Sequence, residues 1–191
     1  METQDIFRNL TTLETERLIL RKMTLDDAED MFEYASDPDV AKYTTWDAHQ
    51  SIKDSKFFLK IVVERYKNRQ ITDWGIVHKG DGKLIGTCGF AECHLIHSRA
   101  EIGYALSRKY WRKGYMSEAV SAIIKFGFQT MNLNRIEARC EVENIASARV
   151  MEKVGMQFEG ILRQHIFTKG KYCDLKIYSI LRQDFFGEQY G

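Results

Sequence analysis

Alternating apolar and polar residues along the chain predict a series of β-strands. The segments RLILRKM at 17–23 and RIEARCE at 135–141 have this period. The same period, together with the turn residues between segments, predicts further strands over 73–78, 83–90, 100–106, 157–167 and 171–181. The Asp81-Gly82 pair and the turn at 168–170 each join two of these strands, so both pairs are expected to be hairpins.

Helical spacing of apolar residues predicts helices between the strands. Thr24 is the expected N-cap of a short helix that runs to about Ser36 and is ended by Asp37-Pro38. Further helices are expected over 48–68, 114–130 and 144–154, the last with Gly155 in the position of a C-cap glycine. The order is β, α, α, then β, β, β, α, β, α, β, β, which predicts a mixed α+β domain.

Composition narrows the class of protein. The chain has 191 residues and is 44% apolar, so we expect a single domain over 1–191, with a core over about 15–183. The net charge of +1, from 28 basic and 27 acidic residues, argues against a nucleic-acid or membrane-surface binder. No apolar run approaches the roughly 20 residues of a membrane span, and the first residues are unlike a secretory signal. We therefore expect a cytoplasmic protein.

The cysteines give no sign of a metal site. None of the four forms a CxxC pair. Cys93, His94 and His97 lie close together in the sequence, but their spacing matches no familiar zinc pattern. We expect reduced structural thiols and no metal.

Candidate chemistry gathers in the stretch EIGYALSRKYWRKGYMSE, residues 101–118. A strand runs into a loop that opens a helix, and the first turn of a helix offers unpaired N–H groups and a positive dipole end to an anion. Gly114 allows close approach of a phosphate, and Ser117 can add a hydroxyl contact. Four basic residues surround the loop: Arg108, Lys109, Arg112 and Lys113. The pattern indicates a phosphate site, and a solvated basic junction is the alternative. GxxxxGK[ST] and GxGxxG are both absent.

The same loop carries a resemblance to a known family. The segment Trp111-Arg112-Lys113-Gly114-Tyr115-Met116 resembles the coenzyme A loop, [QR]xxGx[GA], of the GCN5-related N-acetyltransferase (GNAT) superfamily, although only Gly114 matches strictly. Three more segments resemble its ribosomal-protein alanine/serine N-acetyltransferase (RimJ/RimL-like) branch: TERLILRKMTLDDAEDMFEYASDPDV, GYMSEAV and NIASARVMEKVGMQFEGILRQ. They lie in the right order between about Thr15 and Leu181, so the chain is identified as a member of this family.

The resemblance implies a fold and an activity. The implied fold is a GNAT-type mixed, mostly antiparallel, splayed central sheet flanked by helices. The implied activity is transfer of an acetyl group from acetyl-CoA, as co-substrate, to a primary amine by direct attack in a ternary complex. The acceptor would be a protein N-terminal amine or a small amine such as a polyamine, an amino acid or an antibiotic. The segment 43–49 is expected on the acceptor side, and a homodimer is compatible with the resemblance.

The resemblance also implies which residues hold acetyl-CoA. The backbone of the loop from Trp111 to Met116, with Ser117, would surround the diphosphate. Backbone groups of the preceding strand would pair with the pantetheine arm as an added strand does. They would come from Tyr104, Ala105 and Leu106. The Asn144 side chain would contact the cofactor, and plain helix capping is the alternative role for it.

Two residues are candidates for catalysis. Ser147 lies where related ribosomal-protein acetyltransferases place a serine proposed to protonate the departing thiolate, and an ordinary small residue in a helical turn is the alternative. Many superfamily members use a tyrosine at the position of Met151, which cannot donate a proton, so water is a further candidate. Glu101 is the candidate base, directly or through a water, unless it pairs with an arginine and only organises the sheet. The remaining alternative is an acyl-CoA-binding module without activity.

Overall fold

The computed structural model describes residues 10–70 and 72–187. The strands are Leu13–Glu14 (β1), Leu18–Arg21 (β2), Asp73–His78 (β3), Leu84–His94 (β4), Arg99–Leu106 (β5), Arg135–Glu141 (β6), Gln157–Thr168 (β7) and Lys171–Leu181 (β8). The α-helices are Ala28–Ala35 (α2), Pro38–Ala41 (α3), Ile52–Lys67 (α4), Tyr115–Gln129 (α5), Ile145–Lys153 (α6) and Arg182–Phe186 (α7). Short 3-10 turns are formed by Leu25–Asp27 (η1), Leu95–His97 (η2) and Arg108–Tyr110 (η3).

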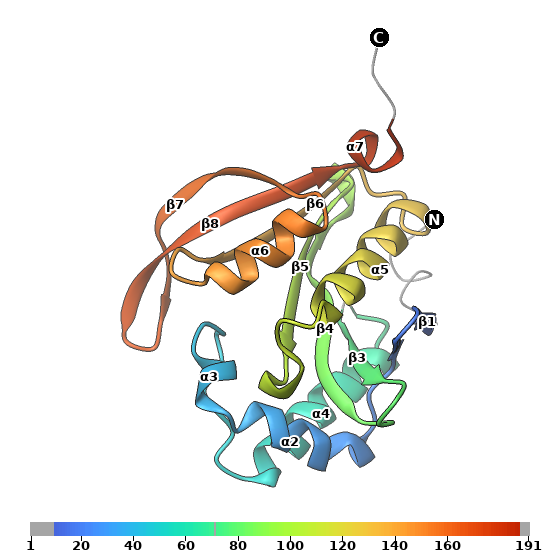
Figure 1. Cartoon of the computed structure of the whole chain (residues 1–191), viewed down its shortest axis with the longest axis vertical. Helices are drawn as coiled ribbons and strands as arrows, with labels where there is room; N and C mark the ends of the chain where they lie inside the picture. The colour runs from blue at the N-terminus through green and yellow to red at the C-terminus, as the bar shows by residue number, and fades with distance from the viewer. Residues whose placement is uncertain (1–9, 71, 188–191) are drawn as a thin grey trace.

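The described strands form one eight-stranded sheet in the order β1-β2-β3-β4-β5-β6-β8-β7 (Figure 1). Neighbouring strands are antiparallel except for β5 and β6. These two are parallel because α5 carries the chain back from the end of β5 to the start of β6. The fold class is therefore the predicted mixed, mostly antiparallel sheet flanked by helices.

Helices cover both faces of the sheet. The apolar stripe of α5 packs on one face: a Cβ built on Gly127 would lie 2.7 Å from Ile136 Cδ1 in β6 and 3.3 Å from Phe90 Cζ in β4. Tyr34 of α2 interacts with Thr87, three residues before Phe90 and therefore on the other face of β4. We call the side of α5 and α6 the helix-α5 face and the other side the helix-α2 face.

The structure adds short elements that the sequence pattern does not predict. They are β1, α3, α7 and the 3-10 turns η2 and η3. Asp37-Pro38, expected only to end a helix, also begins α3, because the Asp37 side chain accepts the N–H of Asp39 and Pro38 occupies the first turn. The helix expected over 48–68 begins only at Ile52, since Ser51 and Asp54 form a capping box there.

Candidate active site

Strands β5 and β6 separate halfway along their length. Their parallel ladder ends at the pair Ile102–Ala138, whereas β5 continues to Leu106 and β6 to Glu141. The facing edges beyond this point have no strand partner, so their backbone groups are free to pair with a ligand as an added strand would. We call this opening the β5–β6 gap.

Alternation along β5 decides which backbone groups face the gap. The N–H of Ser107 donates to the carbonyl of Ile85 at 2.7 Å, which makes these two a hydrogen-bonded pair of the β4–β5 ladder. Such pairs recur at every second residue, so Ala105 directs its N–H and C=O toward Thr87 in β4. The Ala105 backbone therefore pairs with β4 and does not face the gap, so the implied pairing with a pantetheine arm would use its neighbours.

Tyr104 and Leu106, the neighbours of Ala105, direct their backbone groups toward the gap by the same alternation. The carbonyl of Leu106 already accepts a hydrogen bond from Trp111 Nε1–H at 2.8 Å. Trp111 thus contributes a side-chain contact that ties the loop to the end of β5. What the edge offers to a ligand is the N–H and C=O of Tyr104 and the N–H of Leu106.

The loop after β5 turns its main-chain amides outward. Arg112 and Gly114 both have left-handed backbone conformations, with φ of 60° and 82°. The first intrahelical hydrogen bond of α5 is donated by the N–H of Glu118 to the carbonyl of Gly114, at 3.0 Å. Across the described residues, the N–H groups of 112–117 have no acceptor within the protein. Adjacent amides in such a bend form a concave anion site at the positive end of a helix dipole.

Two of the four basic residues expected at this loop are used elsewhere, while Arg112 and Lys113 stay within it. Arg108 pairs with Asp37 at 2.7 Å, and Lys109 pairs with Glu33, so both are turned toward α2 and α3. In their place, Arg17 from the start of β2 and Lys153 from the end of α6 approach Gly114. Arg17, Lys153 and Gly114 come from three separate parts of the sequence.

Arg17 and Lys153 converge on one point. A Cβ built on Gly114 would lie 3.4 Å from Arg17 Nη2 and 3.7 Å from Lys153 Nζ. Lys153 is exposed and makes no ion pair with any described residue. Two cations held beside six free amides favour a polyanion at this position. Neither residue was predicted, because no pattern within the loop points to residues that are so distant in the sequence.

Arg17 is held by Glu118, which anchors α5 to the edge of the sheet. The Glu118 carboxylate accepts from Thr15 Oγ1 at 2.6 Å, from the N–H of Arg17 at 2.8 Å and from Arg17 Nε at 2.7 Å. Burial alone would raise the pKa of Glu118, but these hydrogen bonds outweigh it and hold the pKa below its usual value. Arg17 also lies 4.3 Å above the Tyr115 ring, whose hydroxyl lies 3.0 Å from His78 Nε2.

The start of α6 brings two hydroxyl groups together. Asn144 caps the helix, with its side-chain oxygen 3.1 Å from the N–H of Ser147, so the capping role expected for it is present. The Ser147 hydroxyl lies 2.8 Å from the hydroxyl of Tyr104 in β5. Met151, one turn later, is fully buried, and Cys140 in β6 lies beside Ser147. Met116 of the loop is also a core residue.

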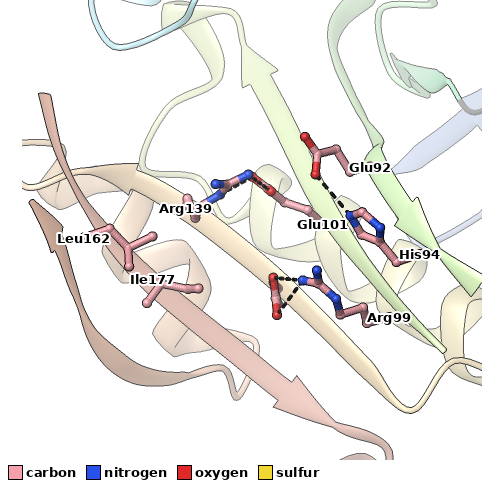
Figure 2. A pocket seen from close by; sticks show the side chains of 8 residues that line it. Glu92, His94, Arg99, Glu101, Arg139, Leu162 and Ile177 are labelled. Atoms are coloured by element: carbon pink, nitrogen blue, oxygen red, sulfur yellow. Dashed lines mark hydrogen bonds and ion pairs between the residues drawn. The ribbon is translucent and has the colours of Figure 1, made fainter. Parts of the chain in front are cut away.

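Glu101 lies on the helix-α2 face, three residues before Tyr104 on β5. It lines a pocket of about 260 Å³ whose other walls are Glu92, His94, Arg99, Glu137, Arg139, Leu162 and Ile177 (Figure 2). Its carboxylate accepts from Arg139 Nε at 2.9 Å and contacts a second nitrogen of the same guanidinium. Glu101 is therefore paired with an arginine, the alternative role that the sequence left open. The pocket borders the point where β5 and β6 separate.

The segment expected on the acceptor side folds back on itself. Trp46 packs against the core, and His49 Nδ1 lies 2.8 Å from the Ser55 hydroxyl. In the neighbouring α3, the carbonyl of Ala41 accepts a hydrogen bond from Lys169 Nζ at the tip of the β7–β8 hairpin. A second pocket, of about 390 Å³, lies along this hairpin and is lined by Glu141, Val142, Glu143, Gln164, Lys171, Tyr172, Cys173 and Asp174.

Two other features of the described residues bear on function. They contain no group of three or more His, Cys, Asp or Glu side chains placed to hold a metal ion. No helix within 10–70 or 72–187 is long and apolar enough to cross a membrane.

Comparison with known proteins identifies the family. Residues 17–157 match the family model of the acetyltransferase (GNAT) domain. An uncharacterised N-acetyltransferase, p20, of Bacillus licheniformis is 39% identical over 93% of this chain and 100% of its own length. A GNAT-family acetyltransferase of Bacillus anthracis superposes with a TM-score of 0.80 at 36% identity, covering 91% of this chain and 99% of that structure.

A more distant relative carries a named substrate. The ribosomal-protein-serine acetyltransferase of Escherichia coli is 32% identical over 52% of this chain and 55% of its own length. The matches agree with the mostly antiparallel sheet flanked by helices. The chain belongs to the GNAT acetyltransferase family, and it is an acyltransferase related to the ribosomal-protein branch.

Proposed function

We propose that the protein transfers the acetyl group of acetyl-CoA to a primary amine. The observation that carries this proposal is the continuity of two open features: the free amides of 112–117 and the unpaired edge of β5 in the β5–β6 gap. One suits the diphosphate of coenzyme A and the other its extended pantetheine arm. Family membership supports the same choice of acyl donor.

The residues at the gap fit this substrate without rearrangement of the fold. The amides from Arg112 to Ser117 would bind the diphosphate, with Arg17 and Lys153 neutralising charge. The free backbone groups of Tyr104 and Leu106 would pair with the amides of the pantetheine arm. This path leads from the start of α5 toward Ser147, so the thioester would lie between Tyr104 and the start of α6.

Acetyl transfer in this arrangement is a direct displacement. The neutral amine nitrogen attacks the thioester carbonyl, the new N–C bond forms, and the C–S bond breaks with its electron pair moving to sulfur. The attacking nitrogen loses one proton to a base or to water. We place the amine on the helix-α2 face, where the pocket around Glu101 meets the end of the β5–β6 ladder.

Glu101 remains our candidate for the base, directly or through a water. It faces the pocket that the amine would enter, on the side of β5 opposite to Tyr104. Its ion pair with Arg139 holds the carboxylate in place beside β6. A bridging water would let Glu101 accept the proton while the ion pair stays intact.

We infer that the acceptor is a protein N-terminal amine. The end of β6 lines both pockets, through Arg139 in one and Glu141 in the other, and each pocket contains acidic and basic side chains. Such a lining suits a peptide, which presents an ammonium group and backbone carbonyls in turn. The similarity to a ribosomal-protein-serine acetyltransferase supports the same class. A small amine is the second candidate, favoured by the carboxylates Glu92, Glu137 and Glu143 in these pockets. A cytoplasmic location and a homodimer stay predictions.

A thiol-release assay tests this proposal. Acetyl-CoA is incubated with the protein and a panel of amines, and free coenzyme A is captured by a thiol-reactive chromophore. The panel holds peptides with N-terminal serine or alanine, the same peptides with blocked N-termini, a polyamine and free amino acids. We expect release with an open peptide N-terminus and none with the blocked form. Binding of acetyl-CoA without release for any amine would contradict the enzymatic proposal and favour a binding module.

A further inference from the structure

The hydroxyl groups of Tyr104 and Ser147 contact each other beside the β5–β6 gap. Tyr104 projects from β5 on the helix-α5 face, and its hydroxyl lies 2.8 Å from Ser147 Oγ and 3.2 Å from the Ser147 carbonyl. Ser147 is in turn fixed at the start of α6 by the Asn144 cap. Both hydroxyls stand where β5 has separated from β6, next to the path that we propose for the thioester.

We propose that Tyr104 is a positioning residue for acetyl transfer, which holds the Ser147 hydroxyl so that it donates a hydrogen bond to the departing sulfur. This inference rests on the proposed function. A hydroxyl carries one hydrogen and two lone pairs. When Tyr104 donates to Ser147 Oγ, the serine hydrogen is left free to point into the gap. Negative charge developing on the sulfur favours hydrogen bonds donated in this order, from Tyr104 to Ser147 and from Ser147 to sulfur, because each bond polarises the next.

The two hydroxyls stabilise the thiolate without giving up their protons. Burial raises the pKa of Tyr104 well above its usual value, and the hydrogen bond with Ser147 only partly offsets this. A thiol has an ordinary pKa of about 8.5, so neither hydroxyl is acidic enough to protonate a thiolate. The C–S electron pair therefore stays on sulfur, held by the hydrogen bond from Ser147, until water supplies a proton.

Two other side chains near Ser147, Met151 and Cys140, are poor hydrogen-bond donors. Met151, fully buried one turn after Ser147, has no hydrogen to donate. Cys140 contacts Ser147 from β6, and burial raises the pKa of its thiol, which keeps it neutral. An S–H group is a weaker hydrogen-bond donor than a hydroxyl. Tyr104 is thus the strong hydroxyl donor that the described residues place against Ser147.

A double-mutant cycle separates positioning from a general structural effect. Tyr104→Phe removes only the hydroxyl, and we expect kcat to fall about 10-fold while KM for acetyl-CoA changes less than about twofold. Ser147→Ala should lower kcat by about 10- to 100-fold. Because Tyr104 acts through Ser147, adding Tyr104→Phe to the Ser147→Ala enzyme should change kcat by less than about twofold.

Tyr178→Phe is the matched control, since it removes the hydroxyl of another buried tyrosine. That hydroxyl is bonded to Glu152 at 3.1 Å, and Tyr178 lies in β8, which β6 separates from the gap. The control variant should leave kcat unchanged. An unchanged kcat in Tyr104→Phe would overturn the proposal. So would an equal fall of kcat when Tyr104→Phe is made in the wild-type and the Ser147→Ala backgrounds.

A binding measurement tests the positioning role of Tyr104 without an amine acceptor. Its outcome therefore does not depend on whether the proposed acetyl transfer occurs. The Kd values of coenzyme A and of desulfo-coenzyme A are compared from pH 7 to pH 10. The wild-type protein should increasingly prefer coenzyme A as its thiol ionises, by about 10-fold or more. Both Tyr104→Phe and Ser147→Ala should lose this preference. A preference kept in Tyr104→Phe would overturn the positioning role even if acetyl transfer is observed.

Discussion

Single residues at the start of α5 show how charge is assembled from distant parts of the chain. The basic cluster before the helix looks like a phosphate site in the sequence, yet Arg108 and Lys109 are used to hold α2 and α3. The cations that reach Gly114 are Arg17 and Lys153. Local sequence predicts the open amides of the loop well, because they follow from the helix start itself. It cannot predict cations that arrive through tertiary packing.

Lys153→Ala tests the assembled cation pair. We expect KM for acetyl-CoA to rise about 3- to 10-fold with little change in kcat, because an exposed charge on a phosphate contributes about 1 kcal/mol. Acetyl-pantetheine lacks the phosphates, so its KM should not change. Lys125→Ala, at an exposed position of α5 far from Gly114, is the control. Equal effects of both variants, or an effect that high salt does not weaken, would argue against a phosphate contact.

Glu101→Gln tests the candidate base. The variant keeps the shape of the side chain but cannot accept the amine proton, so we expect kcat near pH 7 to fall about 10- to 100-fold. The Kd of acetyl-CoA should stay the same, since the Glu101 side chain lies on the helix-α2 face and is not among the groups that we propose to bind acetyl-CoA. Glu137→Gln is the control, because Glu137 lines the same pocket and also pairs with arginines. Similar kcat losses in both variants would show that Glu101 only organises the sheet.

Asp73 at the start of β3 gives a prediction for stability. Burial raises the pKa of its carboxyl to about 6, against about 3.9 in an unfolded chain. The folded state therefore binds the proton more tightly, so this group favours folding below about pH 4. That contribution is lost as pH rises through 6. Asp73→Asn should raise the free energy of unfolding at pH 7.5 by about 2 kcal/mol, and the gain should vanish near pH 4. A gain that is independent of pH, measured by urea unfolding, would contradict this.

At the scale of elements, the start of α5 depends on the left-handed backbone of Gly114. Alanine there should cost about 1 kcal/mol of stability, and its methyl group would contact Arg17 and Lys153. We expect the affinity for acetyl-CoA to fall about 10-fold or more. Gly82→Ala is the matched control for Gly114→Ala. Gly82 also has a left-handed backbone, with φ of 68°, but no atom lies within 4 Å of the added methyl group. The control variant should cost similar stability and leave the affinity unchanged, as calorimetric titration can measure. Equal affinities in the two variants would argue against the loop as the diphosphate site.

The elements themselves were largely predictable, and the gap between two of them was not. Alternation and helix caps gave the order of strands and helices, with β3, β6 and β8 close to their expected bounds. The separation of β5 from β6 is a property of pairing between strands, and it follows no pattern within either one. For the same reason the sequence could not tell that Ala105 faces β4 while Tyr104 and Leu106 face the gap.

At the scale of the whole molecule, the gap joins two faces of one sheet. Ser147 and Tyr104 lie on the helix-α5 face, together with the loop at 112–117. Glu101 and Arg139 lie on the helix-α2 face, at the pocket (Figure 2). In this account acetyl-CoA enters from one side and the amine from the other, and they meet where the β5–β6 ladder ends. Neither substrate has to leave before the other binds, as a ternary complex requires.

A crystal structure of the protein with coenzyme A would show whether the loop at 112–117 and the β5–β6 gap hold the acyl donor. It should show the diphosphate within hydrogen-bonding distance of the main-chain amides of 112–117, with Lys153 beside it. The pantetheine arm should pair with the backbone of Tyr104 and Leu106, and the sulfur should lie beside Ser147 Oγ. A coenzyme A molecule bound elsewhere, with the loop amides and the β5–β6 gap filled only by water, would contradict the account.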